Sequence, residues 1–172
     1  EGAAALLRNG LVFESSLFSH EHGVQALLPF IAHHFPGAFV LPVAIGKRST
    51  SEEWGSLAEL LAPLLDDDTL IVQSTDFSHY LDREATAEHD AESLAVIISC
   101  DPERAIPLRQ PGHIDSRGAL FVQMTLQRSL GARPSVVAHS SSFEYNPIEA
   151  EKSGGTSYFV ITYGAEASAG GK

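Results

Sequence analysis

Apolar residues along the chain gather in short dense runs, separated by longer stretches in which they recur every three or four positions. Dense runs rich in β-branched and aromatic residues are typical of strands, and the longer spacing is typical of one face of a helix. The runs predict strands at residues 11–15, 39–45, 69–73, 135–139 and 156–163. The spacing predicts helices at residues 1–9, 24–35, 52–65 and 82–99, a short helix from residue 101, and a last helix that stops at Gly131.

Local signals sharpen several helix boundaries. Thr50 and Glu53 have the spacing of a capping box, in which a hydroxyl and a carboxylate each bind a free amide at the start of a helix. Asp115 or Ser116 stands at the expected N-cap of the last predicted helix. Pro29 fits its helix poorly, because proline removes a backbone hydrogen bond unless it lies in the first turn or at a kink.

The helix predicted at residues 82–99 is expected to have one apolar and one polar side. The apolar stripe contains Ala91, Leu94, Ala95 and Ile98. His89 lies on or near the polar side, where a surface position is expected.

Strands that alternate with helices up to the final pair indicate an α/β fold. We predict a mostly parallel central sheet flanked by helices, with an antiparallel strand allowed at the end. The chain has 172 residues, enough for one sizeable core, so a single domain is expected over residues 1–164. Residues 165–172 are rich in Ala, Gly and Ser, and we expect them to form a disordered tail.

The amino-acid composition argues against nucleic-acid and membrane partners. The formal net charge is −11, and nucleic-acid binding needs clustered Lys and Arg that the chain lacks. No apolar run reaches the roughly 20 residues that span a bilayer, so no membrane partner is expected. The single cysteine, Cys100, excludes an internal disulfide framework and a cysteine-rich zinc site, and it favours a reducing compartment such as the cytoplasm.

The loop at residues 74–79 is the first candidate site. It links the predicted strand 69–73 to the helix 82–99, and ligands of open α/β sheets usually bind at such carboxyl ends of strands. Asp76 and His79 supply a carboxylate and an imidazole there. The alternative is that the polar side chains of the loop only satisfy backbone amides and His79 is simply exposed.

Three loops carry histidine and carboxylate groups that would suit one metal ion. They are His20, Glu21 and His22 in the first loop, Asp76 and His79 in the second, and His113 and Asp115 in the third. Two histidines and one carboxylate on one face of an iron ion leave open positions for a substrate and dioxygen, as in non-haem oxygenases. In an extended segment His20 and His22 would project the same way. The alternative is that these histidines are surface residues of polar loops.

Three stretches resemble the successive motifs of the Memo-like family, which is related in fold to the class III extradiol dioxygenases. They read EHGVQALLPF at residues 21–30, STDFSHY at residues 74–80 and IDSR at residues 114–117. The resemblance covers roughly residues 11–164, and it accounts for Pro29, which belongs to the first family motif. It implies a non-haem metal site for oxygen-dependent chemistry on a small aromatic substrate.

The family motifs also imply roles for individual residues. His22 matches a metal ligand, and His79 matches the acid/base residue of the related dioxygenases. Apart from the motifs, we expect Asp76 to orient His79, because a carboxylate hydrogen-bonded to one imidazole nitrogen fixes the tautomer. Asp115 stands where many Memo-like proteins have a cysteine. A carboxylate at this position makes the ligand set more similar to that of the dioxygenases, in which a carboxylate is the third metal ligand. The implied ion is iron(II), with zinc or copper as alternatives. Substrate contacts are expected from His20, His113 and Arg117.

The first histidine of the family lies in an amino-terminal motif resembling PHAGY, which this sequence does not contain. We therefore expect the site to be short of one ligand and the sheet of one strand. Two functions stay open: an iron dioxygenase-like enzyme, and a binding module for a peptide or small ligand that keeps the fold without the chemistry. A plain α/β domain with satisfied histidines is a third alternative, and the oligomeric state is left open.

Overall fold

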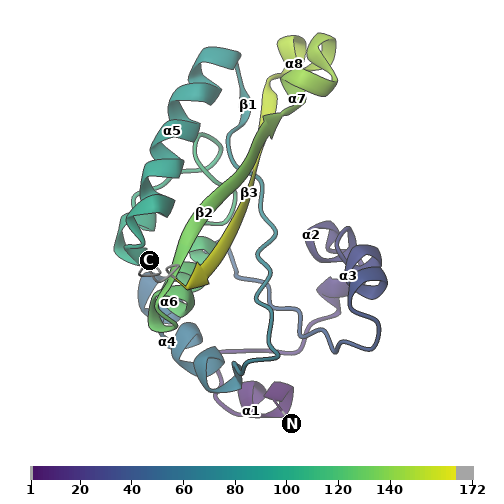
Figure 1. Ribbon diagram of the computed structural model, residues 1–172, viewed down its shortest axis with the longest axis vertical. Helices are drawn as coiled ribbons and strands as arrows, with labels where there is room; N and C mark the ends of the chain where they lie inside the picture. Colours follow the sequence, from purple (N-terminus) through teal and green to yellow (C-terminus); the bar gives the residue numbers. More distant parts are fainter. Residues whose placement is uncertain (1, 166–172) are drawn as a thin grey trace, which may run out of the picture.

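The computed structural model describes residues 2–165 as helices arranged around a small antiparallel sheet (Figure 1). The helices are α1 (Gly2–Leu7), α2 (His22–Gln25), α3 (Leu28–His34), α4 (Ser51–Leu61), α5 (Arg83–Ser99), α6 (Arg117–Ser129), α7 (Ser142–Tyr145) and α8 (Pro147–Ser153). Short 3₁₀ helices are η1 (Ser16–Ser19), η2 (Ala62–Leu64) and η3 (Pro102–Ala105), and the strands are β1 (His79–Leu81), β2 (Ala132–Ser141) and β3 (Gly155–Ala165). None of the described helices has the length and apolar character needed to cross a membrane.

The sheet has the strand order β1-β3-β2, and both pairings are antiparallel. β2 and β3 pair along nearly their whole length. The strands predicted at residues 135–139 and 156–163 lie within them, so these predictions and the antiparallel ending are confirmed. β1 adds a short third strand at the start of β3, where His79 lies opposite Thr156. The tail predicted at residues 165–172 falls outside the described residues, apart from Ala165 at the end of β3.

The mixture of helices and strands is confirmed, but the mostly parallel sheet is not. The segments at residues 11–15, 39–45 and 69–73, predicted as strands, have no ladder partner among the described residues. An apolar run becomes a strand only where a neighbouring backbone exchanges hydrogen bonds with it. These segments therefore remain irregular, and Phe39 and Leu70 within them are exposed.

The chain between β2 and β3 forms α7 and α8 at one end of the sheet (Figure 1). Gly154 ends α8 with a φ of 88°, in the left-handed region where glycine is favoured. A Cβ at this position would overlap the backbone of Tyr80. Glycine therefore lets the start of β3 approach β1 closely, and this pairing places His79 beside the sheet.

The core lies among α4, α5, α6, η3 and the inner face of the sheet. Its buried side chains include Trp54, Leu57, Phe77, Val96, Ile97, Leu108, Ile114, Leu120, Phe121 and Met124. Ile114 retains only 1% of its exposed surface, so it anchors the turn that leads into α6. His113 and Asp115 flank this anchor, and both are thereby held close to the core.

The helix predicted at residues 82–99 forms as α5, but its buried face differs from the predicted stripe. The buried residues are Thr86, Asp90, Ser93, Val96 and Ile97, whereas Ala91, Ala95 and Ile98 are exposed. Asp90 and Ser93 can be buried because their polar atoms have partners; Ser93 Oγ, for example, donates to the His113 carbonyl oxygen at 3.1 Å. Apolar spacing alone therefore selected the wrong side of this helix.

Helix-start signals were more reliable guides. The Thr50 hydroxyl accepts from the Glu53 amide at 3.3 Å, and the Glu53 carboxylate accepts from the Thr50 amide at 2.7 Å, as the capping box predicts. Pro29 is the second residue of α3, in the first turn, where its missing N–H leaves no helical hydrogen bond unmade. The family pattern and helix geometry thus agree at this residue.

Substitution of Thr50 by alanine is expected to lower the free energy of unfolding by about 1 kcal/mol, because the amide of Glu53 loses its acceptor. Thr50→Ser keeps the hydroxyl and should retain most of the stability. Urea titration of both variants measures the difference. Equal destabilisation by alanine and serine would show that the hydroxyl does not act as a cap.

Candidate functional site

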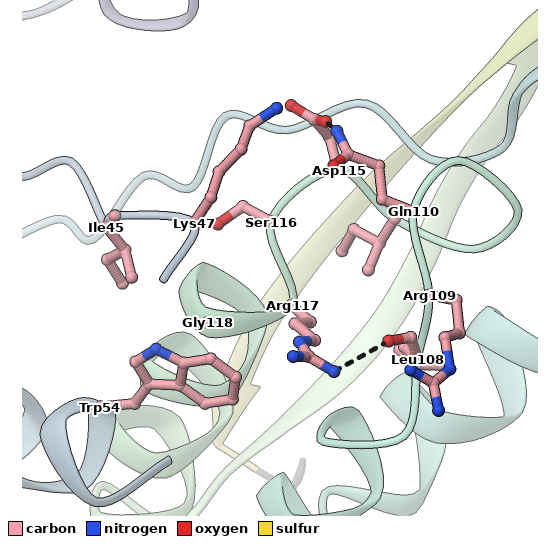
Figure 2. Close-up of a pocket in the computed structure, with 12 residues that line it drawn as sticks. Ile45, Lys47, Trp54, Leu108, Arg109, Gln110, Asp115, Ser116, Arg117 and Gly118 are labelled. Carbon is pink, nitrogen blue, oxygen red and sulfur yellow. Dashed lines mark hydrogen bonds between the residues drawn. The ribbon is translucent and has the colours of Figure 1, made fainter. Parts of the chain in front are cut away.

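A pocket of about 310 Å³ lies between the segment before α4 and the turn that enters α6 (Figure 2). One wall is apolar and includes Ile45, Trp54 and Leu108. The polar lining groups are Lys47, Arg109, Gln110, Asp115, Ser116 and Arg117. The pocket therefore offers an apolar surface for a ring, two or more cationic groups and one carboxylate.

Asp115 lies at the mouth of this pocket rather than at the cap of α6. The cap is Ser116, whose hydroxyl accepts from the Ala119 amide at 3.3 Å. The amide of Asp115 donates to the Asp76 carbonyl oxygen at 2.9 Å, which ties the turn to the loop at residues 74–79. The Asp115 carboxylate is 45% exposed and accepts from the Gln110 side-chain amide. It is therefore available to a ligand or metal ion.

His79 faces Asp115 across the junction of the two segments. Its Nε2 lies 3.9 Å from Asp115 Oδ1, and the side chain is 11% exposed. Nδ1 lies 2.8 Å from the Phe77 carbonyl oxygen, which can only accept, so Nδ1 carries a proton. In the neutral imidazole Nε2 then presents its lone pair toward Asp115. The Phe77 carbonyl oxygen, rather than the predicted Asp76 carboxylate, orients the ring.

Asp76 contributes through its backbone. Its side chain is exposed, and its negative charge adds to burial in raising the pKa of Tyr158 on β3. Its carbonyl oxygen holds the Asp115 amide. Asp76 is therefore placed to position Asp115.

The first predicted loop lies differently from the expected extended segment. His20 ends η1 with Nδ1 2.7 Å from the Ser19 hydroxyl, whereas His22 begins α2 with a side chain that is 95% exposed. Glu21 separates them as the N-cap of α2, so the two imidazoles do not follow the alternation of a strand. A Cβ at Gly23 would lie 3.5 Å from Ser74 Oγ, so the start of α2 is beside the loop at residues 74–79.

Two predicted substrate contacts, Arg117 and His113, have hydrogen-bond partners within the protein. Arg117 donates to the Ile106 carbonyl oxygen at 2.8 Å and lies over the Trp54 ring at 5.6 Å, so it forms part of the pocket wall. His113 is absent from the pocket lining and points to α5, with Nε2 2.6 Å from Glu92 Oε2. The turn before α6 thus carries ligand-type groups to two separate places.

The predicted iron set fits by its chemistry but is not assembled in the described residues. Imidazole and carboxylate are suitable donors for iron(II), and His79 and Asp115 face each other. Within the described residues, however, three ligand atoms come within 4.8 Å of one another only at His89, Glu92 and His113. From the sequence His89 was predicted to be a surface residue and Glu92 was not singled out, although their spacing puts both on one helix face.

Comparison with known proteins identifies related sequences. The sequence model of a family described as "Memo-like protein" matches residues 8–161. A MEMO1 family protein of Ignicoccus hospitalis is 25% identical over 150 residues, which cover 83% of this chain and 53% of that protein. A MEMO1 family protein of Methanosarcina acetivorans is 33% identical over 86 residues, covering 48% of this chain and 32% of that protein.

The protein MK0963 of Methanopyrus kandleri, also a MEMO1 family protein, is 30% identical over 106 residues, which cover 59% of this chain and 38% of that protein. The chain therefore spans about half the length of these relatives, or less. No solved structure matched the chain.

Proposed function

This chain belongs to the Memo-like family, and we propose that it is a dioxygenase-like protein whose pocket beside Asp115 binds a metal ion and a small aromatic substrate. The ion proposed first is iron(II), with zinc or copper as alternatives, and its ligands are Asp115 and His22. The observation that carries the proposal is His79 Nε2, which lies 3.9 Å from the exposed Asp115 carboxylate. A bound iron(II) ion would supply open positions for dioxygen and a bidentate substrate.

The residues of the chain have distinct tasks in this proposal. His79 takes a proton from the substrate hydroxyl at Nε2, because Nδ1 is already committed to the Phe77 carbonyl oxygen. Histidine suits this task because it exchanges protons near neutral pH. Asp115 provides a negative charge that the Asp76 carbonyl oxygen and the Gln110 amide hold in place.

The pocket has the composition to bind an aromatic substrate with ionised oxygens. Figure 2 shows the Lys47 side chain pointing toward Asp115, with Trp54 and Ile45 on the wall below. An aromatic ring would pack against the apolar wall, and Lys47 and Arg109 would attract a phenolate or carboxylate oxygen.

The alternative is a binding module that recognises a peptide or small ligand without a metal. The 95% exposure of the His22 side chain favours it, because a metal ligand is usually held by its surroundings. In this case the same pocket binds its ligand through Lys47, Arg109 and Trp54. Iron binding that is lost with the Asp115 carboxylate separates the two functions.

Replacement of Asp115 by alanine is expected to weaken iron(II) binding by more than about 10-fold while leaving stability nearly unchanged, because Ser116 supplies the helix cap. Ser116→Ala should show the opposite pattern: a loss of about 0.5 to 2 kcal/mol of stability and unchanged iron affinity. Anaerobic iron titration and urea unfolding measure the two effects. Asp115→Cys should shift preference toward zinc or copper(I), because a thiolate is softer than a carboxylate.

The iron titrations distinguish the oxygenase proposal from the binding module. If Asp115→Ala binds iron as tightly as the wild type, Asp115 is not a ligand and the oxygenase proposal loses its main support. If the wild type binds no iron, the binding module is the function to pursue. Asp67→Ala, a change at an exposed residue of a turn, serves as the matched control.

A further inference from the structure

A second group of ligand-type side chains lies outside the pocket, between α5 and the turn before α6. His89 Nδ1 is 3.3 Å from Glu92 Oε2 and 3.3 Å from His113 Nε2, and the last two atoms are 2.6 Å apart. All three atoms therefore lie within 3.3 Å of one another. Two histidines and a carboxylate are a common ligand set for catalytic zinc.

The distances match the edges of a metal polyhedron. Zinc bonds to histidine nitrogen and carboxylate oxygen are about 2.0 to 2.2 Å long, so neighbouring ligands of a tetrahedral ion are about 3.3 Å apart. Both separations from His89 Nδ1 have this value. Only the hydrogen-bonded pair of Glu92 and His113 must open, by a fraction of an ångström for each side chain.

The backbone holds this cluster in position. His89 and Glu92 are three residues apart on α5 and share one face of the helix. A Cβ at Gly112 would lie 3.4 Å from His89 Nε2, so the far edge of the ring packs against the turn and Nδ1 faces the cluster. Ser93 Oγ donates to the His113 carbonyl oxygen at 3.1 Å, which fixes the turn to α5.

A ring proton of His113 now lies in the cluster. His113 Nδ1 accepts from the Arg109 amide at 3.3 Å, so Nε2 carries the ring proton and donates it to Glu92, and His89 Nδ1 lies 3.3 Å from the same carboxylate oxygen. These hydrogen bonds, first from His113 and then from His89, hold the pKa of Glu92 below its usual range. A cation could replace the proton on each of these two ring nitrogens; each proton would move to the other nitrogen of its ring, and at His113 the long contact of Nδ1 with the Arg109 amide would give way.

We propose that His89 Nδ1, Glu92 Oε2 and His113 Nε2 form a binding site for a divalent transition-metal ion, with zinc as the best match to this donor set. Glu92 and His113 also line a hollow with Val96, Arg104 and Leu108, which leaves room for water as a fourth ligand. The site is separate from the pocket beside Asp115 and does not depend on the function proposed for that pocket. Its ion links α5 to the turn that carries Asp115.

Calorimetric titration with zinc alone tests this site in the Asp115→Ala background, where the pocket has lost its carboxylate. We expect one zinc ion per chain, bound more than about 100-fold more weakly after a further Glu92→Gln substitution. Glu88→Gln is the matched control, because Glu88 is an exposed glutamate on the same helix outside the cluster. It should bind zinc as the background protein does.

A second measurement guards against misfolded variants. Zinc should raise the thermal midpoint of the background protein and of Glu88→Gln, because an ion that binds only the folded state stabilises it. It should not raise the midpoint of Glu92→Gln or His89→Ala, whose circular dichroism verifies their folding. Equal zinc affinity in Glu92→Gln and the background, or no zinc binding by the background, would overturn the proposal. Neither zinc result tests iron binding at Asp115, because both are obtained in proteins that lack this carboxylate.

Discussion

Replacement of Asp90 by alanine is expected to lower the free energy of unfolding by about 3 to 5 kcal/mol, the largest stability effect that we predict. Asp90 is 3% exposed on the inner side of α5. Its Oδ1 accepts from the Ser78 and Ser157 hydroxyls, each at 2.6 Å, and its Oδ2 lies 2.7 Å from His139 Nε2. One carboxylate thus joins α5 to β2, to β3 and to the loop before β1.

The effect is large because the partners of Asp90 cannot all find substitutes. Ser78 and Ser157 are fully buried. The Ser78 hydroxyl can turn to the Gly112 carbonyl oxygen at 2.6 Å, but the Ser157 hydroxyl has no other acceptor among the described residues. A buried hydroxyl without an acceptor costs about 1 to 3 kcal/mol by itself.

Denaturant unfolding of Asp90→Ala and of a matched control variant measures the change in the free energy of unfolding. Asp67→Ala removes an exposed aspartate from a turn and should change stability by less than about 0.5 kcal/mol. Asp90→Asn should lie between the two, because the amide keeps one acceptor oxygen. A loss of less than about 1 kcal/mol in Asp90→Ala would mean that the carboxylate does not organise the sheet and α5.

Replacement of His79 by alanine is expected to reduce turnover of an aromatic diol substrate by roughly 10²- to 10⁴-fold, provided that the protein has the proposed oxygenase activity. The physical reason is the loss of the Nε2 lone pair beside Asp115, which takes the substrate proton in the proposal. Bound iron should be retained, because the proposed ligands are His22 and Asp115. Oxygen uptake with a panel of catechols and iron content by elemental analysis measure both quantities.

His33→Ala is the matched control for His79→Ala, because His33 is an exposed histidine on α3 and should leave turnover unchanged. Loss of iron in His79→Ala would make His79 a metal ligand instead of the proton acceptor. Full activity in that variant would remove it from the mechanism altogether. Stability should fall by about 0.5 to 1.5 kcal/mol, because the ring is largely buried and loses its hydrogen bond to the Phe77 carbonyl oxygen.

The Asp90 network also bears on the site. Ser78 directly precedes His79, and the Ser78 carbonyl oxygen accepts from the Ser157 amide at 2.8 Å. The amide of His79 donates to the Pro111 carbonyl oxygen at 3.0 Å, four residues before Asp115. The facing pair of His79 and Asp115 is therefore built on hydrogen bonds to the sheet and to the turn before α6.

Structural features that depend on residues close together in the chain could be predicted from the sequence alone. The capping box at Thr50 and Glu53 and the extent of α5 follow from backbone groups within one or two helical turns. The candidate residues Asp76, His79 and Asp115 were also found this way, because their motifs are contiguous in the chain. In these cases the residues that decide the structure are neighbours in sequence.

Strand pairing and the burial of polar side chains could not be predicted in this way, because both depend on partners that are distant in sequence. The apolar run at residues 39–45 has strand character, yet it forms no strand without a neighbouring backbone among the described residues. Asp90 is buried because Ser157, 67 residues away, supplies a hydroxyl. His89 meets His113 across 24 residues of sequence, and only the packing of the turn against α5 brings their nitrogens within 3.3 Å.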